Sequence, residues 1–367
     1  MIRYIIALSL LGLKNAELLD LLRNHKDKIS SIFDETIQMQ SNEFGNMRYN
    51  ALLSGLEERE RALDSAEELL VQNDEFGIKS TYYGEENYPK QLMQIDNPPA
   101  IIYYRGAEFY DLSEKTIACL GTEKPKVTAY NAVNYLMPQW ARGGCTIISG
   151  LEKGVDQIAL QSAMTAGGKV IAVAACGLDR IEKPLDRFAE RILESGGIIV
   201  SENAMGVNRD RYSVNGRNRL AVGLSRVVTI MECEADDDLI QSALIAGRQG
   251  KSVFCPAGGS SGTEKLISEG AAIAIKGGKD TAQIRNILVY DETRQPSAGE
   301  IKVMYMITLV RLLKNVKALK DTCTELGIPY PDGRDAKLIA EQLDSECKKK
   351  GLTQNDLTQT LVRHVIE

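Results

Sequence analysis

The sequence predicts an α/β protein built on a doubly wound, Rossmann-like, mostly parallel sheet. The first observation is that short apolar runs alternate with helical stretches from Lys115 to about Lys276. The second is that runs such as TIACL, KVIAVAA and RVVTIME are apolar throughout, which is typical of parallel strands covered on both faces. Because crossovers between parallel strands are right-handed, this order gives a doubly wound sheet.

The first part of the chain, to about Gly77, is expected to be helical because Leu and Ile recur at helical spacing among charged residues. The opening apolar run shows no small-residue cleavage site and passes into an amphipathic pattern, so we interpret it as a helix of a folded domain. No other run is long or apolar enough to span a bilayer. Pro89, Pro98 and Pro99 then predict an extended segment rather than a long helix.

The central region is expected to alternate strands with helices. In order, the predicted segments are TIACL and VTAYNAVNYLMPQWAR, TIIS and VDQIALQSAMTA, KVIAVAA and PLDRFAERILES, GIIVSE, RVVTIME and DDLIQSALIAGRQ, SVFCP and TEKLISEG, and AAIAI. A polar linker follows, and a helical tail begins near Ile301. We therefore predict three domains: helical 1–80, Rossmann-like 81–280, and a linker with a C-terminal helical module, 281–367.

Composition is that of an ordinary soluble globular protein, with 44% hydrophobic and 26% charged residues. The net charge is −6, so any nucleic-acid contact must come from a local basic patch. The seven cysteines are scattered singly without a CxxC pair, which argues against a zinc knuckle or a redox motif. Reduced thiols in this pattern indicate a cytoplasmic location.

Loops at the carboxyl ends of the predicted strands are the candidate binding region, because ligands of such sheets bind there. Glycine lets an anionic group approach backbone N–H donors, and the following helix adds its positive end. Glycines that merely form tight turns are the alternative for any single loop. The candidate phosphate-binding residues are Gly121, Thr122, Lys124, Lys126, Ser149, Gly150, Gly154, Asp156, Arg217, Asn218, Arg219, Ser261, Gly262 and Thr263.

Among these, Arg217 and Arg219 are expected to clamp a phosphate from a polar loop that also carries Arg209 and Arg211. No loop matches the dinucleotide fingerprint or the Walker A pattern, so no nicotinamide or ATP site is predicted.

Catalytic chemistry has weak support. The chain has only two histidines, His25 and His364. Several carboxylates fall near strand ends, but Asp156 and Glu264 stand where they would equally cap or charge a helix start. We therefore predict binding rather than catalysis, with no catalytic residue, metal ion or cofactor.

The order of motifs from about Tyr82 to Ile275 resembles the DprA/Smf family of DNA-processing proteins. The motifs are YPKQL, DNPPAIIYYRG, SGLEKGVDQIAL, ACGLD, IIVSE, GRNRLAVGLS and GTEKLISEGA. The helical start also resembles the small helical domain, of the SAM or helix-hairpin-helix kind, that opens many members. The resemblance implies an extended Rossmann fold that binds single-stranded DNA, protects it during natural transformation, and helps to load a RecA-type recombinase, commonly as a cytoplasmic homodimer.

The sequence departs from the family pattern at three places. Glu123 stands where the family usually has arginine, and Asp236–Asp238 where it usually has a Ser-Gly-Ser run. Leu160 stands where a histidine is usual. The added negative charges oppose phosphate binding, although Lys124 or Lys126 could replace the arginine.

Two alternative functions stay open. The first is cleavage of nucleotides, because the loop of phosphoribohydrolases is partly similar to Pro256, Gly258–Gly259 and Gly262–Glu264; Glu264 and Arg217 would be the candidate residues. The second is that the protein is a divergent family member with a vestigial site, which acts within a complex.

Overall fold

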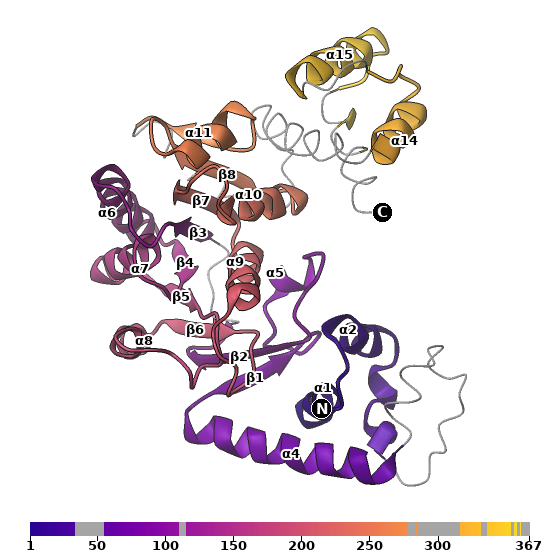
Figure 1. Cartoon of the computed structure of the whole chain (residues 1–367), viewed down its shortest axis with the longest axis vertical. Helices are drawn as coiled ribbons and strands as arrows, with labels where there is room; N and C mark the ends of the chain where they lie inside the picture. The colour runs from indigo at the N-terminus through magenta and orange to yellow at the C-terminus, as the bar shows by residue number, and fades with distance from the viewer. Residues whose placement is uncertain are drawn as a thin grey trace. The chain divides into compact units, whose positions relative to one another are not determined.

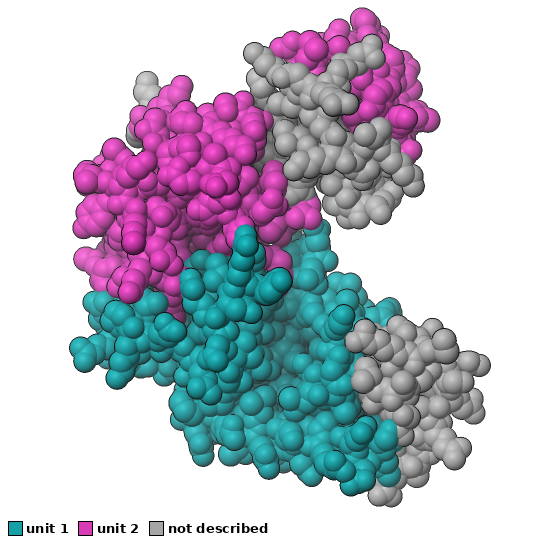
Figure 2. Space-filling model, in the orientation of Figure 1, with its two compact units in different colours: residues 1–112, 171–217 teal, residues 113–170, 218–367 magenta. Residues whose placement is uncertain are grey.

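A computed structural model describes residues 1–33, 55–109, 115–277, 284, 316–331, 336–353, 356–357 and 360. The chain divides into two compact units. Unit 1 comprises residues 1–112 and 171–217, and unit 2 comprises residues 113–170 and 218–367 (Figure 2). The division into three domains stays a prediction.

The N-terminal part of unit 1 is helical, as expected. It consists of α1 (Ile2–Leu10), α2 (Asn15–Asn24), two 3₁₀ turns, η1 (Lys26–Lys28) and η2 (Ser30–Phe33), and the long helix α4 (Leu56–Glu75) (Figure 1). Helix α1 packs against α4. Its apolar face, with Ile5, Ile6 and Leu8, is almost completely buried, and so are Leu18 and Leu21 of α2. Burial of this apolar stripe holds the helices together.

The remaining elements of unit 1 include two antiparallel strands. They are β1 (Lys79–Tyr82), α5 (Lys90–Met93), β2 (Ile101–Gly106), β5 (Val170–Val173), α8 (Leu185–Glu194), β6 (Ile198–Ser201) and the first part of α9 (Arg211–Leu224). Strand β2 is antiparallel to both β1 and β6, whereas β5 and β6 are parallel. The segment that contains Pro89, Pro98 and Pro99 therefore forms the short helix α5 and leads into strand β2, and it holds no long helix, as expected.

Unit 2 holds a wholly parallel set of strands. Its elements are β3 (Thr116–Gly121), α6 (Val127–Arg142), β4 (Thr146–Gly150), α7 (Val155–Thr165), β7 (Val227–Glu232), α10 (Leu239–Arg248), β8 (Ser252–Pro256), α11 (Ser261–Ser268) and β9 (Ile273–Ile275). Strand β3 pairs with β4 and β7, β7 pairs with β8, and β8 pairs with β9. Helix α7 packs on β3 and β4, α6 packs on β4 and β7, and α10 and α11 pack on β7 and β8 (Figure 1).

The order of all nine strands is β1-β2-β6-β5-β4-β3-β7-β8-β9. Strand β2 is antiparallel to both of its neighbours, and the other printed strand pairs are parallel, so the predicted doubly wound, mostly parallel, Rossmann-like fold is confirmed. The residues of β4, β5 and β7 are buried along their whole length, which explains why most of their side chains are apolar.

The C-terminal module contains α14 (Val316–Leu326) and α15 (Ala336–Lys349). Its small core includes Leu319, Cys323, Ile339, Leu343 and Leu357. The predicted linker, apart from residue 284, and the first turns of the predicted tail lie outside the described residues.

One local expectation was wrong. Residues 215–219, predicted as the end of a polar loop, lie inside helix α9, which begins at Arg211. Asp210 explains the early start: its Oδ1 accepts the N–H of Ser213 at 2.7 Å, and its own N–H donates to Oγ of Ser213 at 2.8 Å. This reciprocal cap starts the helix before the polar residues.

No helix within the described residues combines the length and the apolar character needed to cross a membrane.

Lys251 closes the carboxyl end of α9 within unit 2. Its Nζ donates to the carbonyl oxygens of Val222 at 2.6 Å and Gly223 at 2.8 Å in the last turn of the helix, where lysine side chains commonly bind the terminal carbonyls. Burial of the ammonium outweighs this stabilisation and lowers the pKa of Lys251 to about 7.

This buried lysine predicts a pH-dependent stability. Between about pH 7 and the ordinary lysine pKa of 10.5, the unfolded chain binds the proton and the folded chain does not. The free energy of unfolding should therefore rise with pH in this window, by at most about 1.4 kcal/mol per pH unit. Lys251→Gln, which keeps a neutral donor, should lose this slope. Urea unfolding of both proteins from pH 6.5 to 9 measures it, and parallel curves would contradict the assignment.

Candidate functional site

In unit 2 the loops that follow β3, β4, β7 and β8 are joined by hydrogen bonds at the carboxyl ends of the strands. The N–H of Thr122 donates to the carbonyl of Glu232 at 3.0 Å, and the N–H of Val155 donates to the carbonyl of Thr122 at 3.1 Å. The N–H of Gly262 donates to the carbonyl of Cys233 at 3.0 Å. The structure thus brings four glycine-containing or acidic loops together, as expected for strand ends of a parallel sheet.

Gly154 is required where the β4 loop meets the β3 loop. Its φ is +79°, in the left-handed region, and a Cβ at this position would collide with the backbone of Thr122 and Glu123. Only glycine meets both conditions. This residue therefore serves the close approach of two loops within the protein.

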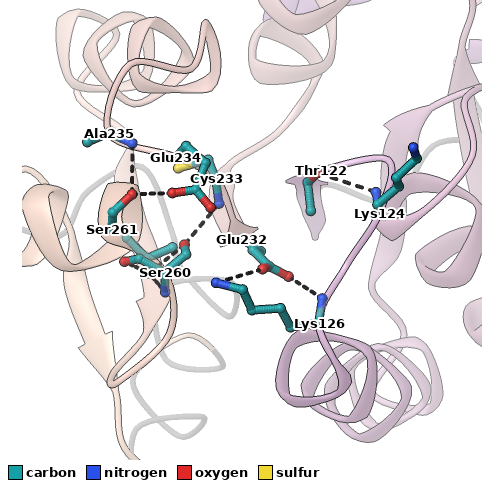
Figure 3. Close-up of polar contacts among 10 residues, drawn as sticks. Thr122, Lys124, Lys126, Glu232, Cys233, Glu234, Ala235, Ser260 and Ser261 are labelled. Carbon is teal, nitrogen blue, oxygen red and sulfur yellow. Dashed lines mark hydrogen bonds and ion pairs between the residues drawn. The ribbon is translucent and has the colours of Figure 1, made fainter.

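Glu232, at the end of β7, places a carboxylate at the start of α6. Its Oε2 accepts the N–H of Lys126 at 2.7 Å, and its Oε1 lies 3.8 Å from Nζ of the same residue (Figure 3). The Glu232 side chain is buried, whereas that of Lys126 is 62% exposed. Because negative charge is stabilised at a helix N-terminus, Glu232 occupies the position that a bound phosphate would favour.

The start of α7 carries its own carboxylate too. Asp156 is the second residue of α7 and is almost fully buried. Its Oδ1 lies 3.0 Å from Oγ of Ser149, and this hydroxyl also contacts the carbonyl of Cys119. Ser149 is completely buried. Both side chains therefore face inward, and they stabilise the β4 loop rather than offer an open donor.

The loop between β8 and α11 is bound to the loop after β7. Oγ of Ser260 accepts the N–H of Cys233 at 3.1 Å, and Oγ of Ser261 accepts the N–H of Ala235 at 3.0 Å and contacts the carboxylate of Glu234 (Figure 3). A Cβ at Gly262 would lie 2.6 Å from Sγ and from the carbonyl oxygen of Cys233. Glycine is therefore needed here so that the two loops can meet.

Helix α11 repeats the same arrangement. Ser260 and Thr263 form a capping box at its start, and the N–H of Ser260 donates to Oγ1 of Thr263 at 2.9 Å. Oε1 of Glu264 accepts the N–H of Gly258 at 2.6 Å. The expectation that Asp156 and Glu264 charge helix starts is thus confirmed. With Glu232, three helices of unit 2 begin beside carboxylates of the protein itself.

The predicted site residues fall into three groups. The first group lies in the joined loops: Gly121, Thr122, Gly150 and Gly154, the buried residues Ser149, Asp156, Gly262 and Thr263, and Ser261, which is exposed but hydrogen-bonded to the loop after β7. Lys124 and Lys126 are exposed. In α9, Arg217 belongs to unit 1 and is 8% exposed, and Asn218 of unit 2 is 5% exposed. Arg219, also of unit 2, is partly exposed.

Sequence reasoning missed the roles of two residues. Glu232 was noted only as a carboxylate near a strand end, and Ser260 only as part of a glycine-rich loop. The signal for Glu232 was an acidic residue that directly continues a fully apolar strand. The signal for Ser260 was a hydroxyl residue three positions before Thr263, the spacing of a capping box.

Acidic side chains dominate the loop that follows β7 at this edge. The segment Glu232–Asp238 carries five carboxylates and no basic residue. Burial, with the nearby charges of Asp237, Glu234 and Glu232, raises the pKa of Cys233 to about 12, so its thiol is not a nucleophile at neutral pH. Within the described ranges, no group of three or more His, Cys, Asp or Glu side chains is placed to hold a metal ion.

Comparison with known proteins places these loops in a family. The family model for DNA recombination-mediator protein A matches residues 79–285, more than half of the chain. The Smf protein of Synechocystis is 28% identical over 232 residues, which cover 60% of this chain and 58% of that protein. The Smf protein of Escherichia coli is 32% identical over 194 residues, 51% of this chain and 52% of that protein. The chain thus spans just over half the length of these curated relatives.

Solved structures agree with this result. DNA processing protein A of Helicobacter pylori, studied for its binding of single-stranded DNA, is 27% identical with a TM-score of 0.50, and the match covers 58% of this chain and 94% of that one. DNA processing protein A of Streptococcus pneumoniae is 22% identical with a TM-score of 0.63, and the match covers 77% of this chain and 98% of that one. At this identity, the similarity supports the fold alone. The joined strand-end loops and the family match together lead to one conclusion: the chain belongs to the DNA recombination-mediator protein A family, the DprA/Smf proteins.

Proposed function

We propose that this protein binds single-stranded DNA, protects it, and assists the loading of a RecA-type recombinase as a cytoplasmic homodimer. The observation that carries the proposal is the family match over residues 79–285. The structure of the Helicobacter pylori relative, solved to describe single-stranded DNA binding, supports it. We retain the three-domain organisation, 1–80, 81–280 and 281–367, as part of this proposal.

Side-chain cations, rather than bare helix N-termini, are the phosphate contacts that we propose for unit 2. Glu232, Asp156 and Glu264 already lie at the starts of α6, α7 and α11. Lys124 and Lys126 extend into solvent from the β3 loop, and Arg219 is partly exposed on α9. Such contacts bind every sequence alike, because phosphates carry no base information.

An enzymatic alternative, cleavage of nucleotides, would use Glu264 in the first turn of α11, with Arg217 as the second candidate residue. Glu264 is exposed at the strand end, as that role requires. Its carboxylate, however, accepts the N–H of Gly258 and supports the loop itself. We therefore favour binding. A divergent member with a vestigial site would bind neither DNA nor nucleotide.

Lys124→Ala and Arg219→Ala should each weaken binding to oligo-dT. Each lost phosphate contact reduces the slope of log affinity against log salt by about one. Fluorescence anisotropy between 50 and 300 mM salt measures this slope. Arg142→Ala, at the opposite end of α6, is the matched control and should leave it unchanged. Arg217→Ala should also weaken binding, but its melting temperature must be checked because the residue is buried. Absence of wild-type binding at low salt would overturn the proposed function.

Glu123→Arg should strengthen DNA binding. Glu123 is exposed in the β3 loop, so the substitution replaces a repulsive carboxylate with a phosphate-binding guanidinium without disturbing the core. The salt slope should increase in magnitude by about one or more. The same anisotropy titration tests it, with Glu123→Gln separating loss of repulsion from gain of a contact. Equal affinity for wild type and Glu123→Arg would show that DNA does not approach this loop.

The enzymatic alternative predicts release of free base from nucleoside monophosphates, and Glu264→Gln should abolish that release. Our proposal predicts no release by the wild-type protein. Chromatographic detection of the base after incubation with the four common monophosphates distinguishes them. Release by wild type that is lost in the variant would favour the hydrolase, whereas release that persists would remove Glu264 from that role.

A further inference from the structure

Unit 1 exposes an aromatic ring beside two arginines at the start of α9. Tyr212 is 86% exposed, and Val207, in the preceding loop, is 40% exposed. Arg209 and Arg211 are exposed as well. Aromatic side chains contribute to folding mainly through the area that they bury. A tyrosine this exposed therefore adds little to the stability of the fold.

The loop that presents this ring is held firmly at its base. The N–H of Gly177 donates to the carbonyl of Val207 at 2.8 Å, and the N–H of Gly206 donates to Oδ1 of Asp179 at 2.9 Å. Oγ of Ser201 donates to the carbonyl of Cys176 at 2.7 Å. These bonds join the loop after β6 to the loop after β5, so the segment before Arg209 has a defined conformation.

Asp210, the acidic residue between the arginines, is engaged in the helix cap. Its Oδ1 accepts the N–H of Ser213 at 2.7 Å. Hydrogen bonds from the backbone and hydroxyl of Ser213 and from the backbone of Tyr212 lower the pKa of Asp210. The carboxylate therefore caps the start of α9, and the exposed residues Arg209 and Arg211 flank it in the sequence.

We propose that Tyr212 stacks on a base of single-stranded DNA while Arg209 and Arg211 contact neighbouring phosphates. The inference deepens the proposed function, on which it rests, by adding a contact surface in unit 1. An exposed ring next to two arginines in the sequence suits a single strand, along which bases and phosphates alternate. A duplex keeps its bases stacked inside, so the ring discriminates between the two forms. The acidic Glu232–Asp238 segment of unit 2 offers no such match.

The test uses tryptophan as a reporter of stacking in the full-length protein. The only tryptophan, Trp140, is 4% exposed, so its emission should respond little to DNA. Tyr212→Trp should be strongly quenched by oligo-dT and not by a duplex of the same length. Tyr135→Trp, at a 61% exposed position of α6, is the matched control and should not be quenched.

Affinity measurements separate stacking from charge. Tyr212→Ala should bind oligo-dT about 5- to 100-fold more weakly with an unchanged salt slope, and Tyr212→Phe should bind like wild type. Arg209→Ala combined with Arg211→Ala should reduce the slope by about two. Melting temperatures should stay at the wild-type value, because the altered side chains are exposed.

The outcomes distinguish this inference from the function on which it rests. If wild type binds oligo-dT but Tyr212→Trp is not quenched, or is quenched no more than Tyr135→Trp, the stacking contact is refuted and the proposed function stands. If Tyr212→Ala binds like wild type, the contact is also refuted. If wild type binds no single-stranded DNA, both fail together.

Discussion

Three carboxylates at three helix starts determine what the candidate site of unit 2 can do. Parallel strands direct the positive ends of their helices to one edge, and that edge attracts anions whether they come from a ligand or from the chain. In this protein Glu232, Asp156 and Glu264 supply the negative charge. Several backbone N–H groups at this edge therefore already donate within the protein: those of Lys126 and Gly258 to carboxylates, and those of Thr122, Val155 and Gly262 to backbone carbonyls.

This arrangement changes how glycine-rich loops are to be understood. Gly154 and Gly262 do permit a close approach, but what approaches is another loop of the same protein: the backbone of Thr122 and Glu123 in one case, and Cys233 in the other. A glycine pattern therefore indicates close packing at a strand end and does not by itself identify the partner. Family membership and exposed cations carry the functional proposal for this edge, and the glycines support its architecture.

Most of the secondary structure was predictable because its signals are local. The helix Val127–Arg142 and the buried strands Thr146–Gly150 and Val227–Glu232 follow directly from runs of apolar residues and their spacing. The start of α9 was not predicted because Asn215, Gly216 and Arg217 have the composition of a loop. The helix start is instead determined by the reciprocal hydrogen bonds between Asp210 and Ser213. The antiparallel β1–β2 pair also escaped a definite prediction.

The contacts of the candidate site were less predictable because they join distant parts of the sequence. Glu232 meets the backbone of Lys126 across 106 positions, and Ser260 meets that of Cys233 across 27. No pattern within one loop reveals such partners. The burial of Arg217 and Asn218 likewise depends on the packing around α9, whereas their residue types alone favour the surface.

The hydrogen bond between Glu232 and the main chain of Lys126 also bears on how the family can diverge. Because the donor is a backbone N–H, which every residue except proline possesses, the side chain at position 126 can change without loss of the hydrogen bond. The number of residues between Gly121 and Lys126 cannot change, since one insertion or deletion would move this N–H away from the carboxylate. Selection should therefore preserve the number of residues in this turn more strictly than the residue types. In an alignment of relatives, the turn would contain no insertions or deletions while its residues vary.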